Sequence, residues 1–183
     1  MNLQHEMTIK VNINTFVLAE WVKETGKEVM MLREYVKTGK KSILASLKKS
    51  GAVIFSKHKH NLITTAGRTV LARRLAGNTT YTGSINYGLL GTQVSPSPSN
   101  SSTQLGTEVF RKLASSLAYD NNIAYVDFFY TAGDTNGTYT EFGNVIDGTA
   151  SVNTGQLFSY IATGGWVKSS AQSLFVSCKY TIS

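Results

Sequence analysis

Three arginines close together are the side chains of this sequence best suited to gripping an anion. They are Arg68, Arg73 and Arg74, in the stretch NLITTAGRTVLARRLAG. The cluster is either an anion-binding site or the solvated face of a helix. A phosphate-binding loop needs several glycines before the helix and a Lys-Ser or Lys-Thr pair, and this stretch has neither. A structural role therefore explains these arginines best.

The same stretch carries the signals of a short helix. Thr64 or Thr65 can cap its start, because a threonine hydroxyl accepts a hydrogen bond from a free backbone N–H. Apolar residues and alanines then recur with near-helical spacing, and Gly77 ends the pattern. The last two arginines fall in the final turn, where positive charge favours the helix dipole. We expect one helix over about residues 65–76.

Two histidines are the best candidates for a metal site. His58 and His60 alternate with Lys57 and Lys59, so they share one face of a predicted strand. A third ligand is missing from the neighbouring sequence, and the lysines repel a cation. We expect no metal and no cofactor.

No catalytic group of residues stands out. The sequence has no G-x-S-x-G motif, and a glycosidase needs two carboxylates facing one bond, whereas the acids are scattered. The single cysteine, Cys178, excludes an intramolecular disulfide and a CxxC zinc motif, and we expect it to be a small core side chain. The sequence predicts that the protein is not an enzyme. The scattered acids are Glu108, Asp120, Asp127, Asp134, Glu141 and Asp147.

Most of the chain after the helix resembles short strands separated by turns rich in Asp, Asn and Gly. In the last run, Leu174, Val176, Cys178, Tyr180 and Ile182 fall on one face of a strand. The pattern predicts a mainly β protein, an antiparallel β-sandwich with one short α-helix. The predicted strands are INYGLLG, VFRKLASSLAY, IAYVDFFYTA, TYTEFGNVI, LFSYIATG and QSLFVSCKYTIS, with turns at Asp120-Asn121-Asn122, residues 133–137, Asp147-Gly148 and Gly164-Gly165 and a loop over Val94–Gln104.

Aromatic side chains allow two interpretations. Tyr125, Phe128, Phe129 and Tyr130 could form a platform for a sugar or a base, but on a strand they divide between two faces, so we expect core packing. A glycan-binding module would instead need exposed aromatics at loops. The candidates for such receptor-facing aromatics are Tyr81, Tyr87 and Tyr139.

The N-terminal part of the chain leaves more alternatives open. Residues 8–14 alternate polar and apolar, as a half-buried strand does. The run EVMMLREYV is either a short helix or the return strand of a hairpin. SILASLK and AVIFSKH resemble two strands joined by a turn at Lys49-Ser50-Gly51.

Positive charge is concentrated in the same region. Residues 1–74 hold 14 Lys and Arg against 5 Asp and Glu, a net +9, whereas residues 75–183 hold 4 against 6, a net −2. This excess is either a solvated surface or a segment that docks on an acidic partner or a nucleic acid. No apolar run approaches the length of a membrane span, and no signal peptide is visible, so we expect a soluble protein made in a cytosol.

An ordered set of short motifs resembles a family of small tailed-phage virion proteins of the tail-fibre, baseplate or collar type. The resemblance covers about residues 43–183 and implies a β-sandwich without catalytic residues. The motifs are Asn61-Leu62-Ile63-Thr64, Ala66-Gly67-Arg68, Leu75-Ala76-Gly77, Gly91-Thr92, Leu105, Glu108, Phe110-Arg111-Lys112, Asn136-Gly137-Thr138 and Glu141-Phe142-Gly143.

The resemblance implies a structural role in the virion, assembled in the host cytoplasm through contacts with other virion proteins and within a symmetric homo-oligomer. It also suggests that Arg68 and Glu141 are structural partners. A receptor-binding module at a fibre tip, a capsid decoration protein and a nucleic-acid binder remain as alternatives, with nucleic acid the least favoured partner.

Residues 1–42 lie outside the resemblance. We predict that they form a separate basic and amphipathic extension that attaches the domain of residues 43–183 to a partner. The alternative is that they add strands to the same sandwich. The predicted subunit or partner contacts are Phe16, Trp21, Met30, Met31, Arg33, Arg73 and Arg74.

Overall fold

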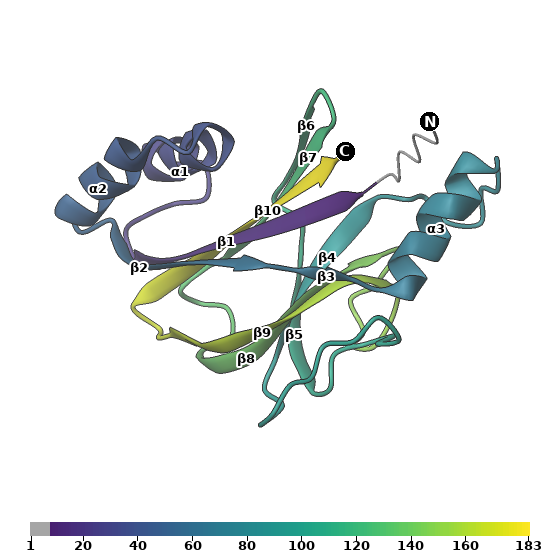
Figure 1. The fold of residues 1–183 in the computed structure, drawn as a ribbon. Helices are drawn as coiled ribbons and strands as arrows, with labels where there is room; N and C mark the ends of the chain where they lie inside the picture. Colours follow the sequence, from purple (N-terminus) through teal and green to yellow (C-terminus); the bar gives the residue numbers. More distant parts are fainter. Residues whose placement is uncertain (1–7) are drawn as a thin grey trace.

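The computed structural model describes residues 8–183, which form two five-stranded antiparallel sheets and three helices (Figure 1). The mainly β architecture predicted from the sequence is therefore confirmed. Sheet A has the order β2 (Val53–His60), β1 (Ile9–Ala19), β10 (Gln172–Ile182), β7 (Ile123–Tyr130) and β6 (Ser116–Asp120). Sheet B has the order β3 (Leu62–Ile63), β9 (Gln156–Lys168), β8 (Gly137–Ile146), β4 (Ile85–Gly91) and β5 (Glu108–Leu113).

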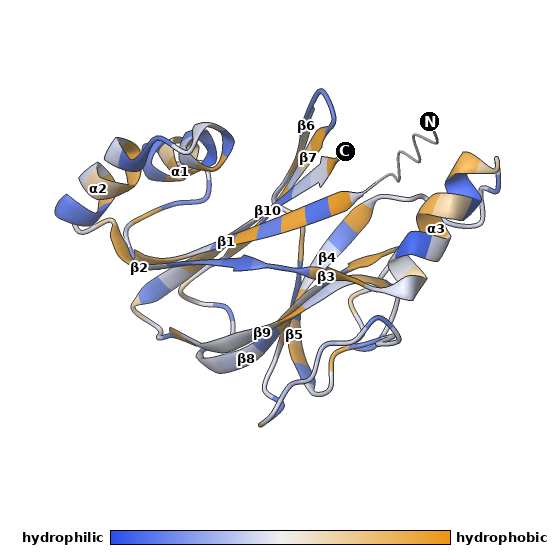
Figure 2. Ribbon diagram, in the orientation of Figure 1, coloured by the Kyte–Doolittle hydropathy of each residue, from blue (hydrophilic) through white to orange (hydrophobic). Residues whose placement is uncertain are grey.

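The main core lies where side chains of the two sheets meet. Alternate residues of β1 and β10 supply one half of it, because successive side chains of a strand point to opposite faces. Figure 2 shows this alternation along β1. The largest contributions from sheet B come from Tyr139, Phe142, Phe158 and Trp166, all buried.

Two helices cover the outer face of sheet A. They are α1 (Lys27–Thr38) and α2 (Lys41–Lys49), and α1 buries Val29, Leu32 and Val36. These side chains have the spacing of one helix face, which decides between the two interpretations of EVMMLREYV in favour of the helix. They form a second apolar cluster with outward residues of the sheet, including Phe16, Phe129 and Phe175.

One strand predicted from the sequence is wrong. The run SILASLK lies in the helix α2. Its Ile43, Leu44 and Leu47 recur at helical spacing, and all three pack into the second cluster. A strand would have turned Leu44 away from the other two, so contact with α1 and the sheet favours the helix.

The third helix agrees with the sequence prediction. Helix α3 spans Thr65–Leu75, and the Thr64 hydroxyl caps it by accepting a hydrogen bond from the backbone N–H of Gly67 at 3.1 Å. It lies at the far end of the molecule from α1 and α2 (Figure 1). Gly67 lets the helix approach β9 closely, because a Cβ there would come within 2.8 Å of the Phe158 backbone. None of the helices among residues 8–183 is long and apolar enough to cross a membrane.

The two sheets are linked along both sides by strands that follow each other in sequence. Asn61 alone separates β2 in sheet A from β3 in sheet B. On the other side, the run VFRKLASSLAY divides into β5 and β6. The N–H of Ala114 donates to Asn86 and the N–H of Ser115 donates to Asp127, so neighbouring residues bond to different sheets.

A predicted turn at Gly164-Gly165 is also wrong. Both glycines lie inside β9, with φ of 75° and 85°, where the pairing register with β8 shifts. Positive φ is typical of a bulge as well as of a turn, so this Gly-Gly pair is compatible with both.

The first strand belongs to the centre of sheet A. β1 lies between β2 and β10 and pairs with β10 from Ile9 opposite Ile182 to Ala19 opposite Gln172. The boundary predicted between residues 42 and 43 therefore does not separate two structural units. For residues 9–19, the structure agrees with the alternative in which the segment adds a strand to the same fold.

We expect a truncated chain that starts at Ser42 to lose cooperative folding. It would lack the partner of both β2 and β10 and the whole of α1, which exposes Phe175 and the core beneath it. Thermal unfolding and near-ultraviolet circular dichroism measure the effect, with Lys10→Ala in the full chain as the control for a change on the exposed side of β1. A cooperative melt of the truncated chain would contradict this prediction.

Candidate functional site

The two edge strands β5 and β6 expose apolar side chains. Val109 and Leu113 lie on β5, and Leu117 and Tyr119 lie on β6 with 57% and 84% of their surface exposed. Large exposed apolar groups in one place typically mark a contact surface. Both strands are the last in their sheets.

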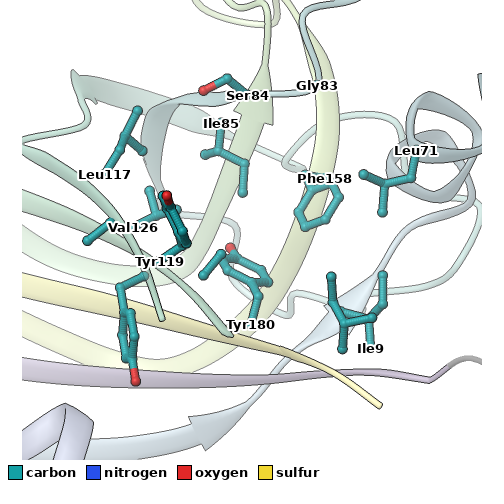
Figure 3. A pocket seen from close by; sticks show the side chains of 14 residues that line it. Ile9, Leu71, Gly83, Ser84, Ile85, Leu117, Tyr119, Val126, Phe158 and Tyr180 are labelled. Carbon is teal, nitrogen blue, oxygen red and sulfur yellow. The ribbon is translucent and has the colours of Figure 1, made fainter. Parts of the chain in front are cut away.

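An apolar groove opens beside β6, at the end of the molecule where the two sheets separate. It encloses about 300 Å³. Figure 3 shows Leu117 and Val126 on one side and Phe158 with Leu71 of α3 on the other, with Ile85 and Tyr180 between them. Surfaces from both sheets and α3 therefore meet here.

The groove offers apolar surface and shape rather than reactive groups. The Tyr180 hydroxyl accepts a hydrogen bond from the Asn144 amide at 2.6 Å, and Ser159 donates to the same amide group of Asn144 at 2.9 Å. Burial raises the pKa of Tyr180, so the phenol stays neutral. This arrangement suits an apolar side chain of a partner better than a polar substrate.

At the opposite edge of sheet A, strand β2 carries two lysines whose ammonium groups bond to sheet B. On β2, Lys57 donates to the Thr163 carbonyl at 3.0 Å and Lys59 donates to the Ala162 carbonyl at 2.6 Å. Both carbonyls belong to β9 in the other sheet. Lysines at an edge strand discourage pairing with another chain, and β6 has none.

The two histidines of β2 face the outer side of sheet A. His58 contacts the Asn14 side chain at 3.1 Å, and the rings of His58 and His60 are 5.3 Å apart. Burial, and His60 beside it, lower the pKa of His58. No group of three or more potential metal-ligating side chains is found among residues 8–183.

A polar cluster fastens α1 to sheet A. Asp127 is buried on the outer face of β7, where it accepts hydrogen bonds from Arg33 at 2.7 Å and from Ser177 at 2.6 Å. In the strand register Ser177 lies opposite Asn14 rather than opposite a histidine. Arg33 was predicted as a partner contact, and the structure instead uses it inside the chain.

A second buried carboxylate fastens the loop that covers sheet B. Glu141 accepts hydrogen bonds from the backbone N–H groups of Gly106 at 2.8 Å, Thr107 at 3.0 Å and Gln93 at 3.2 Å, and from the Tyr160 hydroxyl. Leu105 of the same loop packs into a small apolar cluster on that face. Glu141 therefore holds both ends of the segment between β4 and β5.

The suggested pairing of Arg68 with Glu141 is wrong. Arg68 lies on α3 and donates to the Ile63 carbonyl at 3.0 Å, whereas Glu141 is enclosed on sheet B by the donors described above. The other two arginines of α3 are exposed, and the guanidinium of Arg73 lies 5.5 Å from the ring of Tyr81. They form the solvated face of the helix, and Arg73 and Arg74 remain accessible to a partner.

The remaining predicted contacts divide between core and surface. The prediction that Phe16 contacts a partner is wrong, because its side chain is 1% exposed and stacks on Phe175. Trp21 and Met30 are 56% and 61% exposed, and Met31 is half-buried against the second cluster.

The predicted receptor-facing aromatics do not gather at one place. The prediction that Tyr139 faces a receptor is wrong, because its side chain is 1% exposed and lies in the main core. Tyr87 is half-buried beside the guanidinium of Arg111, and Tyr81 packs partly against the main core. The expected core roles of Tyr125, Phe128, Phe129, Tyr130 and Cys178 are confirmed, since all five are buried.

The sequence patterns do not show the exposed edge of β6. They predict one strand over VFRKLASSLAY, whereas the chain changes sheet at Ala114 and Ser115. The part that could be recognised is the five residues SLAYD followed directly by Asn121-Asn122. A short strand before a tight turn is typical of a hairpin, but it does not show whether the other side of the strand is free.

Comparison with known proteins gives no relative: no family model, no curated protein and no solved structure matches this chain.

We expect Asp127→Ala to lower the free energy of unfolding by about 3 kcal/mol, because it leaves Arg33 and Ser177 without their partner under α1. The matched control is Asp120→Ala on the same sheet, whose exposed carboxylate lies 3.9 Å from Lys37 and contributes less than about 1 kcal/mol. Urea denaturation measures both. Equal losses from the two variants would show that the cluster does not fasten α1.

Proposed function

We propose that this chain is a structural component of a tailed-phage virion, in the tail, baseplate or neck, and that it acts through protein–protein contacts. The contact surface is the β6 surface, which we define as β6 with its exposed Leu117 and Tyr119 and the apolar groove beside it. The observation that carries the proposal is this unguarded apolar edge next to an apolar groove. Such surfaces are rare on isolated domains and common where proteins meet.

The motifs behind the virion resemblance have packing roles, which supports a structural function. A Cβ at Gly91 would lie 2.5 Å from the Glu141 carboxylate, so the glycine makes room for the buried acid. Glu108 and Arg111 form a buried ion pair at 2.6 Å, and Arg111 also donates to Thr149 and Thr154 of the loop between β8 and β9. These contacts hold sheet B and its covering loops together, which is what a structural component requires.

We expect mass spectrometry to detect the protein in purified particles of a phage whose genome encodes it. The variant Tyr119→Lys should be depleted from those particles, because a lysine on β6 opposes pairing and removes apolar contact area. The matched control is Val152→Lys, which changes an exposed apolar residue outside the β6 surface and should be incorporated normally. Absence of the unmodified protein from particles, despite its synthesis in infected cells, would contradict the proposal.

A receptor-binding module is the second candidate, because of one hollow on the outer face of sheet A. It encloses about 350 Å³ beneath the end of α1 and is lined by Asn12, Asn14, Tyr35, His58 and Lys179, among others. Amide, phenol, imidazole and ammonium groups together are typical of sites that bind hydroxyl-rich ligands. No described carboxylate lines this hollow.

For this second candidate we expect Asn12→Ala to weaken binding to a host surface glycan by about threefold to tenfold. Asn12 lines the hollow, and a lost hydrogen bond to a sugar hydroxyl has about that effect. Calorimetric titration measures it, with Thr138→Ala on exposed sheet B surface as the control. If no host glycan binds the unmodified protein, the hollow is not a receptor site.

A further inference from the structure

The two edges of sheet A differ in their capacity to pair with another strand. The edge strand β2 carries the two lysines that cross to β9, whereas β6 pairs only with β7 among the described residues. Alternate N–H and C=O groups of an antiparallel edge strand point away from its neighbour. The free side of β6 therefore carries backbone donors and acceptors beside exposed apolar side chains.

The faces of β6 limit the registers in which it can pair with a copy of itself. Leu117 lies opposite Val126, and Tyr119 lies opposite Ala124, so both face the inner side of the sheet. Ala118 lies opposite Tyr125 and faces the outer side. Directly opposed residues of a pair share a face. Under a two-fold axis perpendicular to the sheet, inner residues must therefore oppose inner residues.

Only one such register pairs all five residues of β6. It places Ala118 opposite Ala118 of the second copy, with Leu117 opposite Tyr119 and Ser116 opposite Asp120. On the groove side, the smaller Leu117 of each copy then contacts the larger Tyr119 of the other. The two Asp120 carboxylates stay well apart, since each lies opposite a serine. This register thus sets apolar side chains opposite apolar ones and keeps the like charges apart.

We propose that the β6 surface binds a second copy of this chain, with β6 antiparallel to β6 about a two-fold axis at Ala118. This inference rests on the proposed function, which assigns protein–protein contact to the β6 surface; the inference names the partner that binds there. The two copies of sheet A join into one continuous sheet across the axis. Two-fold dimers with the same patch on both subunits are the commonest form of protein self-association.

Disulfide cross-linking tests the register directly. In Ala118→Cys the two introduced thiols lie opposite each other at the axis, within the Cα separation that a disulfide requires. In the control Ser116→Cys they are four residues apart along the pair, about 14 Å, and cannot join. The native Cys178 does not interfere, because it is fully buried and burial raises the pKa of its thiol.

With oxidised glutathione, we expect Ala118→Cys to give a covalent dimer and Ser116→Cys alone to give none. A mixture of Ser116→Cys with Asp120→Cys should give a mixed dimer, because these positions oppose each other. Sedimentation equilibrium of the unmodified protein should show a reversible dimer. The double variant Leu117→Lys/Tyr119→Lys should weaken it at least tenfold, because it places like charges opposite each other.

An unmodified protein that stays monomeric at high micromolar concentration would overturn the inference, as would cross-linking of Ser116→Cys as strong as that of Ala118→Cys. Detection of the chain in virions would then still leave the proposed function standing, with β6 bound to a different virion protein. Absence from virions together with a β6 dimer would overturn the proposed function and leave the pairing intact.

Discussion

The main core and the second cluster are both built around the antiparallel pairing of β1 with β10. It joins eleven residues near the start of the chain to eleven at its end, and both strands are buried on both faces along part of their length. Inward side chains such as Ile13 and Val176 reach the main core, whereas outward ones such as Phe16 and Phe175 need a second cover. The helices α1 and α2 are that cover. The basic N-terminal segment is therefore part of the fold, since it supplies β1 and the helix α1 that covers the outward apolar side chains.

Buried carboxylates fix the layers that lie over the sheets. Asp127 binds α1 through Arg33, and Glu141 binds the loop over sheet B through three backbone N–H groups. Glu108 holds Arg111, which in turn reaches Thr149 and Thr154. A buried charge costs several kcal/mol unless it is bonded, so a loop or helix that moved away from its acid would leave that charge uncompensated. Asp127, Glu141 and Glu108, although far apart along the chain, thus each help to hold a helix or a loop in place.

Local patterns predicted much of the fold, and they failed where a distant contact decides. Helix α3 could be predicted because its cap, its alanines and its final glycine lie within one stretch. The last strand could be predicted because its inward residues alternate without exception from Leu174 to Tyr180. The run SILASLK could not, because the apolar spacing of so short a segment suits a strand or a helix until α1 is placed beside it. Phe16 resembled a contact residue because sequence alone does not show that two helices cover it.

The candidate site was harder to predict than the fold. Exposure of Leu117 and Tyr119 follows from β6 being the last strand of its sheet, and strand order is a property of the whole chain. The turn after Asp120 predicted the hairpin with β7, but no local pattern showed that the other side of β6 stays free. Tyr139 shows the converse, because it closely follows the predicted turn at residues 133–137 and yet is 1% exposed in the main core.

Hydrogen exchange at two protein concentrations distinguishes self-pairing through β6 from a β6 edge that stays free in solution. The amides of β1 and β10 should exchange slowly and at the same rate in dilute and concentrated protein, since their bonds lie within one chain. The amides of residues 116–120 that point away from β7 should become protected only in the concentrated sample. Exchange rates over residues 116–120 that do not change with concentration would show that β6 does not pair with a second copy.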